Sequence, residues 1–229
     1  MSCAVAIFVK TPQLSAVKTR LWPGIGRRQA ERLHCASAAA VRSVVAQAGA
    51  NGTIRGYWAL AEAAAASAAF WPGLAHVEQG EGSLGERMAS VYRQLRELHA
   101  GVILVGADAP QLQADMLLQA AAWLAEGPAR LTLGRAADGG FWLFGGNRDI
   151  ATPAWLEPRY SEAATADEFV RAMDAFGDWC ELASLQDIDT LADFAAVRAQ
   201  LQALPAATVE QQGICDLLAE LATIAEPCT

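Results

Sequence analysis

Segments typical of buried strands alternate with segments typical of helices along most of this chain. Short runs of β-branched and other apolar residues, such as residues 4–9 (AVAIFV) and 101–105 (GVILV), have the pattern of strands buried on both faces. In contrast, residues 84, 88, 91 and 95 are apolar at helical spacing, which indicates one buried helix face. Such alternation predicts an α/β layer fold with a mostly parallel sheet and helices on both faces.

The same patterns predict where each element lies. We expect strands over residues 4–9, 53–60, 74–79, 101–105, 130–133, 141–144 and 179–182. We expect helices over residues 27–48, 61–69, 83–100, 111–125, 162–176 and 191–201, and around 214–224. Because no repeat or linker interrupts the pattern, we expect a single domain over residues 1–229, with residues 202–229 as a C-terminal helical extension. That extension is expected to cover the core, with a homodimer contact as the alternative.

Charge and composition exclude several classes of partner. The chain has 17 Lys and Arg against 25 Asp and Glu, a net charge of −8, which argues against nucleic-acid binding. Its first residues lack a signal peptide, and no stretch reaches the roughly 20 apolar residues that a membrane span needs. The five cysteines are scattered without a C-x-x-C pair, as in proteins of a reducing compartment. We therefore expect a cytoplasmic protein.

Cationic side chains follow the first predicted strand. In α/β sheets, ligands bind beyond the carboxyl ends of the strands. Lys10, Lys18, Thr19 and Arg20 lie there, and the two lysines are the only ones in the chain. This cluster of donors suits phosphate oxygens, although a solvated basic loop is an equally good interpretation.

Carboxylates follow three other strands. Asp108, after strand 101–105, is placed to hold a divalent cation, or to cap the next helix. Asp138 precedes Gly139 and Gly140, which allow close backbone approach to a ligand or simply form a tight turn. In the D-I-D-T run at 187–190, which precedes a helix, Asp189 or Thr190 is a candidate helix cap or a second metal ligand. Together with the cationic loop, these carboxylates predict a nucleotide–metal site.

Five motifs occur in a fixed order: F-V-K-x-P…V-K-T-R-L, G-x-L-G-E-R-M, G-x-D-x-P, A-x-D-G-G-aromatic and D-I-D-T. Over residues 7–194 they closely resemble the radical-SAM/selenodomain-associated transferases, also described as arsenosugar-biosynthesis-type glycosyltransferases. The chain departs from that family's pattern at Leu14-Ser15-Ala16, at Arg135 and at Tyr160-Ser161-Glu162. The second motif also reads as a helix N-cap by Ser83 with Glu86 as its partner. The family is a branch of the GT-A, or nucleotide-diphospho-sugar transferase, superfamily, so the resemblance implies a single-domain, GT-A-like three-layer sandwich.

The resemblance also implies a role for each motif. A nucleotide would be bound by Lys10, Lys18, Thr19 and Arg20, with Gly82, Leu84, Gly85, Glu86 and Arg87 near its base. The sugar or acceptor would face Asp138, Gly139, Gly140 and Ser161. Mg²⁺ or Mn²⁺ would be held by Asp108, Asp187 and Asp189.

The implied reaction is metal-dependent transfer of a sugar from a nucleotide-diphosphate sugar to a small-molecule acceptor. Asp138 would act as the base, while Lys18 and Arg20 would neutralise the leaving diphosphate. The alternative is a guanylyltransferase-like nucleotidyl transfer from an NTP to a phosphorylated small molecule. A third interpretation is a protein that binds nucleotide without catalysing transfer.

Overall fold

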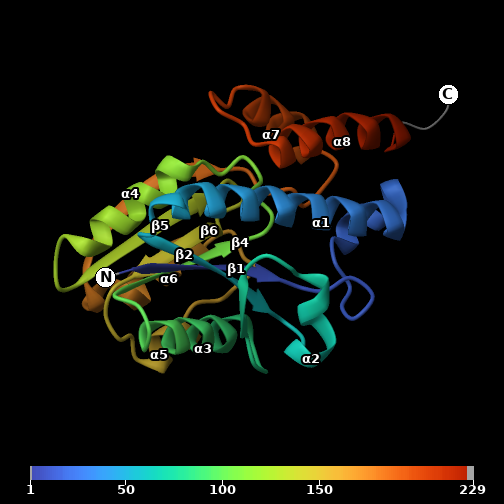
Figure 1. Ribbon diagram of the computed structural model, residues 1–229. Helices are drawn as coiled ribbons and strands as arrows, with labels where there is room; N and C mark the ends of the chain where they lie inside the picture. Colours follow the sequence, from blue (N-terminus) through green and yellow to red (C-terminus); the bar gives the residue numbers. More distant parts are fainter. Residues whose placement is uncertain (1, 226–229) are drawn as a thin grey trace.

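A seven-stranded sheet forms the centre of the molecule (Figure 1). The computed structural model describes residues 2–225, so residues 226–229 of the predicted extension lie outside the described part. The strands are β1 (Cys3–Val9), β2 (Ile54–Leu60), β3 (Ala75–Glu78), β4 (Gly101–Gly106), β5 (Arg130–Ala136), β6 (Phe141–Gly146) and β7 (Asp178–Leu185). Their order across the sheet is β3-β2-β1-β4-β6-β5-β7.

The sheet is mostly parallel, and β6 is the strand that breaks the pattern. Strand β1 pairs in parallel with β2 and β4, and β2–β3 and β5–β7 are parallel as well. Strand β6 runs antiparallel to both β4 and β5. Only residues 137–140 join β5 to β6, which is too short for the crossover that a parallel pair needs. The predicted α/β fold class is confirmed.

Helices cover both faces of the sheet. They are α1 (Trp22–Ala48), α2 (Ala64–Ser67), α3 (Leu84–Arg96), α4 (Ala114–Ala125), α5 (Thr152–Leu156), α6 (Thr165–Met173), α7 (Asp193–Gln202) and α8 (Val209–Ala225). Alternate residues of β1 serve the two cores, because Val5 and Ile7 pack with α1 and α4, whereas Ala4 and Ala6 pack with α3, α5 and α6. The result is the expected three-layer sandwich (Figure 1).

The last two helices form a further layer on α1 (Figure 1). The buried face of α8 presents Ile214, Leu218 and Leu221 to Leu33 and Ala40 of α1. None of the described helices is both long and apolar enough to cross a membrane. The division into one domain with a C-terminal extension stays a prediction.

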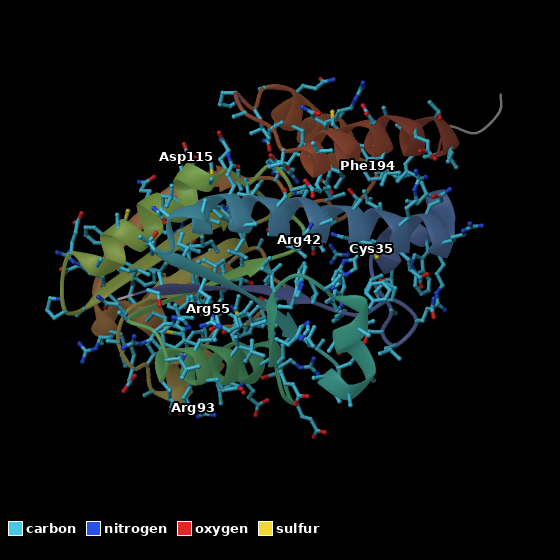
Figure 2. All side chains as sticks on the ribbon, viewed as in Figure 1. Cys35, Arg42, Arg55, Arg93, Asp115 and Phe194 are labelled. Atoms are coloured by element: carbon cyan, nitrogen blue, oxygen red, sulfur yellow. The ribbon has the colours of Figure 1, made fainter. Side chains whose placement is uncertain are left out.

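Some elements differ from the sequence-based expectation. The predicted helix over residues 61–69 is broken into α2 and a 3₁₀ turn at Ala68–Phe70, because Ser67 Oγ donates to the carbonyls of Glu62 and Ala63. Helix α1 begins five residues before the expected start, and Gly26 interrupts it with a φ of 77°. The exposed arginines Arg55 and Arg93 lie on β2 and on α3 (Figure 2).

Candidate functional site

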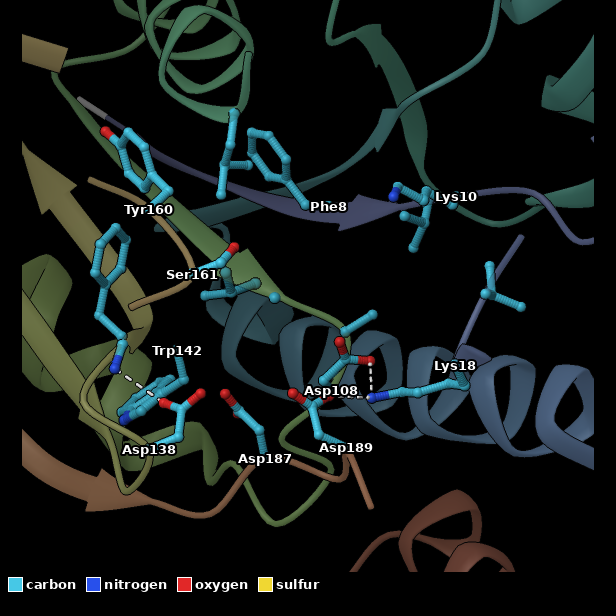
Figure 3. A pocket seen from close by; sticks show the side chains of 18 of the residues that line it. Phe8, Lys10, Lys18, Asp108, Asp138, Trp142, Tyr160, Ser161, Asp187 and Asp189 are labelled. Carbon is cyan, nitrogen blue, oxygen red and sulfur yellow. Dashed lines mark hydrogen bonds and ion pairs between the residues drawn. The ribbon is translucent and has the colours of Figure 1, made fainter. Parts of the chain in front are cut away.

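A pocket of about 520 Å³ opens beyond the carboxyl ends of β1 and β4 (Figure 3). The loop after β1 supplies Lys18, and the loop after β4 supplies Asp108. Asp138 comes from the β5–β6 connection, while Asp187 and Asp189 follow β7. The topology therefore gathers at one edge of the sheet the polar side chains that follow four different strands.

Most of the residues predicted for the site line this pocket, and five do not. Those that line it are Lys10, Lys18, Thr19, Arg20, Leu84, Asp108, Asp138, Gly140, Ser161, Asp187 and Asp189. Those that do not are Gly82, Gly85, Glu86, Arg87 and Gly139.

Lys18 is the electrostatic centre of the pocket. Its Nζ lies 3.0 Å from Asp108 Oδ1 and 3.2 Å from Asp189 Oδ1, and it also donates to the carbonyl of Ile188. The side chain is only 5% exposed, against 41% for Asp108 and 40% for Asp189. Arg20, which is 69% exposed, approaches Asp189 from outside, at 3.5 Å. The buried ammonium thus joins the β1 loop to the ends of β4 and β7.

The pKa values of these groups follow from burial and from their neighbours. Burial acts to lower the pKa of Lys18, but the charges of Asp108 and Asp189 outweigh it and raise that pKa. Burial acts to raise the pKa of Asp108, and the Lys18 ammonium outweighs it and lowers that pKa. For Asp187, burial and then the charge of Asp108 raise the pKa to about 7. Asp187 is therefore the carboxyl group whose charge the site supports least.

Two pocket residues have a left-handed backbone. Lys18 has a φ of 49° and a ψ of 42°, and Ser161 has a φ of 65°. Such conformations cost non-glycine residues on the order of 1 kcal/mol and are concentrated at functional sites. At Lys18 the conformation directs the chain into a 3₁₀ turn at Thr19–Leu21, which leads into α1.

The start of α3 is explained by its own hydrogen bonds. Ser83 and Glu86 form a capping box, and Arg87 Nε donates to the carbonyl of Gly82. A Cβ on Gly85 would lie 2.2 Å from the carbonyl oxygen of Trp155, so this glycine lets α3 pack against α5. The capping interpretation is confirmed, while a role for this segment near a nucleobase stays a prediction.

The Asp138 loop is a tight turn that opens into the pocket. Gly140 N donates to Asp138 Oδ1 at 2.9 Å. Gly139 has a φ of 92°, and a Cβ there would lie 2.0 Å from the carbonyl oxygen of Ala163. The first glycine is therefore required by packing, and Asp138 itself lines the pocket as an exposed residue.

Asp189 does not cap the helix that follows it. Asp193 Oδ2 accepts hydrogen bonds from the backbone N–H groups of Asp189 and Thr190, at 3.0 and 2.7 Å. The cap predicted at Asp189 or Thr190 is therefore not formed by the Asp189 side chain, and Ala192, at the N-cap position of α7, makes no side-chain cap hydrogen bond. This arrangement leaves the Asp189 carboxylate to pair with Lys18 and Arg20.

An apolar wall faces the carboxylates, and the sequence analysis did not predict it. Phe8, Leu84, Met88, Phe141 and Tyr160 form this wall, and Figure 3 shows Phe8 and Tyr160 on the side of the pocket opposite the four aspartates. The Tyr160 hydroxyl donates its proton to Trp155 O at 2.7 Å, so this proton is already used in a hydrogen bond within the protein. Phe8 is the aromatic residue of the F-V-K-x-P motif, and Phe141 is that of the A-x-D-G-G-aromatic motif. Their places in these motifs were the sequence signal that could have predicted the wall.

His34 also lines the pocket, and the sequence analysis did not identify it as a site residue. It lines the pocket from α1, and its Nε2 lies 2.9 Å from the Lys10 carbonyl. Burial lowers its pKa, which favours the neutral imidazole. A lone histidine inside a long helix gives no signal of its own in the sequence.

The side chains match a divalent cation in chemistry but not in arrangement. Aspartate oxygens are the ligands that Mg²⁺ and Mn²⁺ prefer. Even so, within residues 2–225 no group of three or more His, Cys, Asp or Glu side chains is arranged to hold a metal ion. The position between Asp108 and Asp189 is taken by the Lys18 ammonium.

Solved structures with the same architecture define the class of fold. A provisionally assigned nucleotide-diphospho-sugar transferase from Desulfovibrio desulfuricans G20 aligns with a TM-score of 0.82 at 22% identity, covering 98% of this chain and 97% of that one. A cytidylyltransferase from Leptospira borgpetersenii aligns with a TM-score of 0.56 at 12% identity, covering 100% and 98%. A 4-diphosphocytidyl-2C-methyl-D-erythritol synthase from Anaerococcus prevotii aligns at 0.51 and 12%, covering 88% and 96%. The fold is that of the nucleotide-diphospho-sugar transferases.

Sequence comparison gives the family. Residues 33–160, more than half of the chain, match the family described as "Uncharacterized protein conserved in bacteria (DUF2064)", and the chain belongs to that family. No protein of curated function matches the chain. The finer resemblance to arsenosugar-type glycosyltransferases stays a prediction.

Proposed function

We propose that this protein is a transferase that moves a sugar from a nucleotide-diphosphate sugar to a small-molecule acceptor. The observation that carries the proposal is the pocket, where a cationic loop and four carboxylates meet at the edge of the sheet. This is the edge at which α/β folds bind their ligands. The likeness in fold to a provisionally assigned nucleotide-diphospho-sugar transferase supports the same class of substrate.

The two walls of the pocket suit the two ends of such a reaction. On the cationic side, Lys10, Lys18 and Arg20 would bind the diphosphate and stabilise its charge as it leaves. Asp138, on the side of the β5–β6 connection, would take the proton from the acceptor hydroxyl. Between them, Asp108, Asp187 and Asp189 would hold Mg²⁺ or Mn²⁺, which as a Lewis acid would polarise the diphosphate.

A second candidate function is nucleotidyl transfer from an NTP to a phosphorylated small molecule. The likeness in fold to two enzymes that handle cytidine nucleotides favours it. The same cationic loop would bind the triphosphate. The two candidates differ in their products, because nucleotidyl transfer releases pyrophosphate and glycosyl transfer releases a nucleoside diphosphate.

Ligand-induced stabilisation tests the proposal directly. Nucleoside diphosphates, triphosphates and nucleotide sugars are added one at a time, with and without Mn²⁺, and the melting temperature is measured. A ligand at a hundredfold excess over its Kd stabilises the folded state by about 2.7 kcal/mol. We expect stabilisation by at least one nucleotide sugar in the presence of Mn²⁺, and none by any member of the panel would overturn the proposal.

A matched pair of variants tests whether the nucleotide that stabilises the protein binds in this pocket. Asp108→Asn should abolish the stabilisation by nucleotide with Mn²⁺, because it removes a carboxylate at the centre of the pocket. Asp115→Asn makes the same chemical change at an exposed position of α4 (Figure 2) and should respond as the unmodified protein does. A response that survives Asp108→Asn would place the nucleotide elsewhere.

A further inference from the structure

The Lys18 ammonium lies between two of the site's carboxylates, those of Asp108 and Asp189. Its contacts with Asp108 and Asp189 are 3.0 and 3.2 Å, and the Ile188 carbonyl is a third oxygen partner. Asp108 Oδ1 is screened from solvent and makes no hydrogen bond within residues 2–225 besides this ion contact. In the free protein, the Lys18 ammonium is therefore the cation that neutralises Asp108 and Asp189.

The proposed function gives Lys18 the diphosphate to bind, and gives Asp108 and Asp189 a metal ion to hold. The ion pairs between Lys18 and these two carboxylates conflict with both roles. While Lys18 is bound to Asp108 and Asp189, it does not reach out to a diphosphate, because its side chain is 5% exposed. At the same time, the ammonium occupies the Oδ1 atom of each carboxylate. One ammonium also cannot neutralise both the carboxylates and an incoming diphosphate, since like charges would then be brought together at short range.

We infer that Lys18 determines which cation the Asp108–Asp189 pair holds, and that a divalent cation binds there only when Lys18 leaves for the phosphates of a nucleotide. Nucleotide and metal ion then bind together, whereas metal ion alone binds weakly. The inference has a nucleotide half, the release of Lys18 by phosphates, and a metal half, the exclusion of a divalent cation by Lys18. Only the nucleotide half rests on the proposed function. The metal half concerns the free protein.

The loop that carries Lys18 is built in a way that suits such a movement. Lys18 has a left-handed backbone, and no regular secondary structure lies between β1 and the turn at Thr19. The neighbouring Arg20 is exposed, and its guanidinium lies 3.5 Å from Asp189 Oδ2. Release of the ammonium would free the Oδ1 atoms of both carboxylates in one step.

Binding of Mn²⁺ to the free protein tests the metal half. Lys18→Met keeps the length of the side chain and removes its charge, which leaves Asp108, Asp187 and Asp189 without their buried counter-charge. We expect Lys18→Met to bind Mn²⁺ at least tenfold more tightly than the unmodified protein, measured without nucleotide from the loss of the free-Mn²⁺ electron paramagnetic resonance signal. Equal affinities in the two proteins would overturn the inference.

Two further variants separate this effect from a general change in net charge. Arg28→Met also removes one positive charge, at an exposed position of α1 outside the pocket, and should leave Mn²⁺ affinity unchanged. Lys10→Met removes the other lysine of the same loop, which makes no ion pair with a carboxylate of residues 2–225, and should change the Mn²⁺ affinity much less than Lys18→Met. Tighter Mn²⁺ binding in all three variants would point to net charge alone and would overturn the inference.

A measurement on the unmodified protein covers the case in which Lys18→Met does not fold. The melting temperature is followed with Mn²⁺ alone, with UDP alone and with both. We expect the shift with both to exceed the sum of the separate shifts, and an equally large shift with Mn²⁺ alone would overturn the inference. If no nucleotide in the panel binds, the proposed function fails, while the comparison of Mn²⁺ binding without nucleotide still decides whether Lys18 excludes the metal.

Discussion

At the scale of single residues, the pocket shows how one buried neighbour decides the charge of another. Lys18 remains an ammonium in spite of burial because Asp108 and Asp189 lie against it. Asp187 lies two residues before Asp189. The same ammonium stabilises the charged form of Asp187 less than burial and the charge of Asp108 destabilise it. The pKa values of Asp108 and Asp187, two carboxyl groups of one site, are therefore shifted in opposite directions.

The raised pKa of Asp187 makes a prediction for stability against pH. An unfolded aspartate releases its proton near pH 4, and the folded protein holds this one to about pH 7. The contribution of Asp187 is therefore fully present below pH 4 and is lost as pH rises through 7, by at most about 4 kcal/mol. Asp187→Asn should gain in free energy of unfolding over the unmodified protein between pH 4 and 8, measured by urea denaturation with EDTA present.

Asp216→Asn is the matched control, since Asp216 is an exposed residue of α8. Its denaturation midpoints should follow those of the unmodified protein across the whole pH range. Parallel profiles for Asp187→Asn and the unmodified protein would contradict the raised pKa of Asp187.

Which site residues could be predicted depended on the kind of signal. Lys18, Asp108, Asp138 and Asp187 follow strands, and strand ends in an α/β sheet converge on one edge, so sequence position was enough. Their pairing was not predictable, because nothing in the spacing of residues 10–20 shows that Lys18 turns inward. His34 was missed for a similar reason, since its place at the pocket depends on how α1 packs.

At the scale of elements, the strands were easier to predict than the helix ends. The apolar runs that became β1 and β4 carry a strong signal, because both strands are buried on both faces. The alanine-rich segment carried a helical composition without a face to bury, and it forms only the short α2. The direction of β6 could have been deduced from the four-residue connection before it, but not from its periodicity.

The contact between α3 and α5 gives a prediction at this scale. Gly85→Ala would place a Cβ 2.2 Å from the Trp155 carbonyl oxygen, which is backbone and cannot move alone. We expect a loss of about 1–3 kcal/mol in the free energy of unfolding, measured by chemical denaturation, because the two helices must separate. Gly213→Ala in α8 is the control: its Cβ would meet nothing within 4 Å, so it should stabilise by about 1 kcal/mol. A neutral Gly85→Ala would show that α3 is not held at this distance.

At the scale of the whole molecule, α7 and α8 complete the cover of α1. Their apolar residues form a cluster with α1 that lies on the side of this helix away from the sheet. Helix α1 is thus buried on two sides, and it carries the loop with Lys18 at its amino end. The order of the pocket therefore depends on the layer formed by α7 and α8.

The predicted extension can be tested with point variants and with truncation. Leu218→Ala should cost about 2–5 kcal/mol in the free energy of unfolding, because the leucine is fully buried, whereas Ile224→Ala, at a residue 47% exposed, should cost far less. Removal of residues 202–229 should lower the melting temperature of the whole chain in one cooperative transition. A truncated chain that melts as the complete one does would show that the extension is not part of the same folding unit.

The packing of α8 on α1 joins segments about 170 residues apart in the chain. During synthesis the ribosome delivers α1 early and α8 near the end, at roughly 5–20 residues per second. For roughly 9 to 34 seconds at this rate, then, Leu33 and Ala40 of a nascent chain have no partner from α8. Molecular chaperones bind such exposed apolar faces, so α1 is the segment through which we expect the growing chain to engage them.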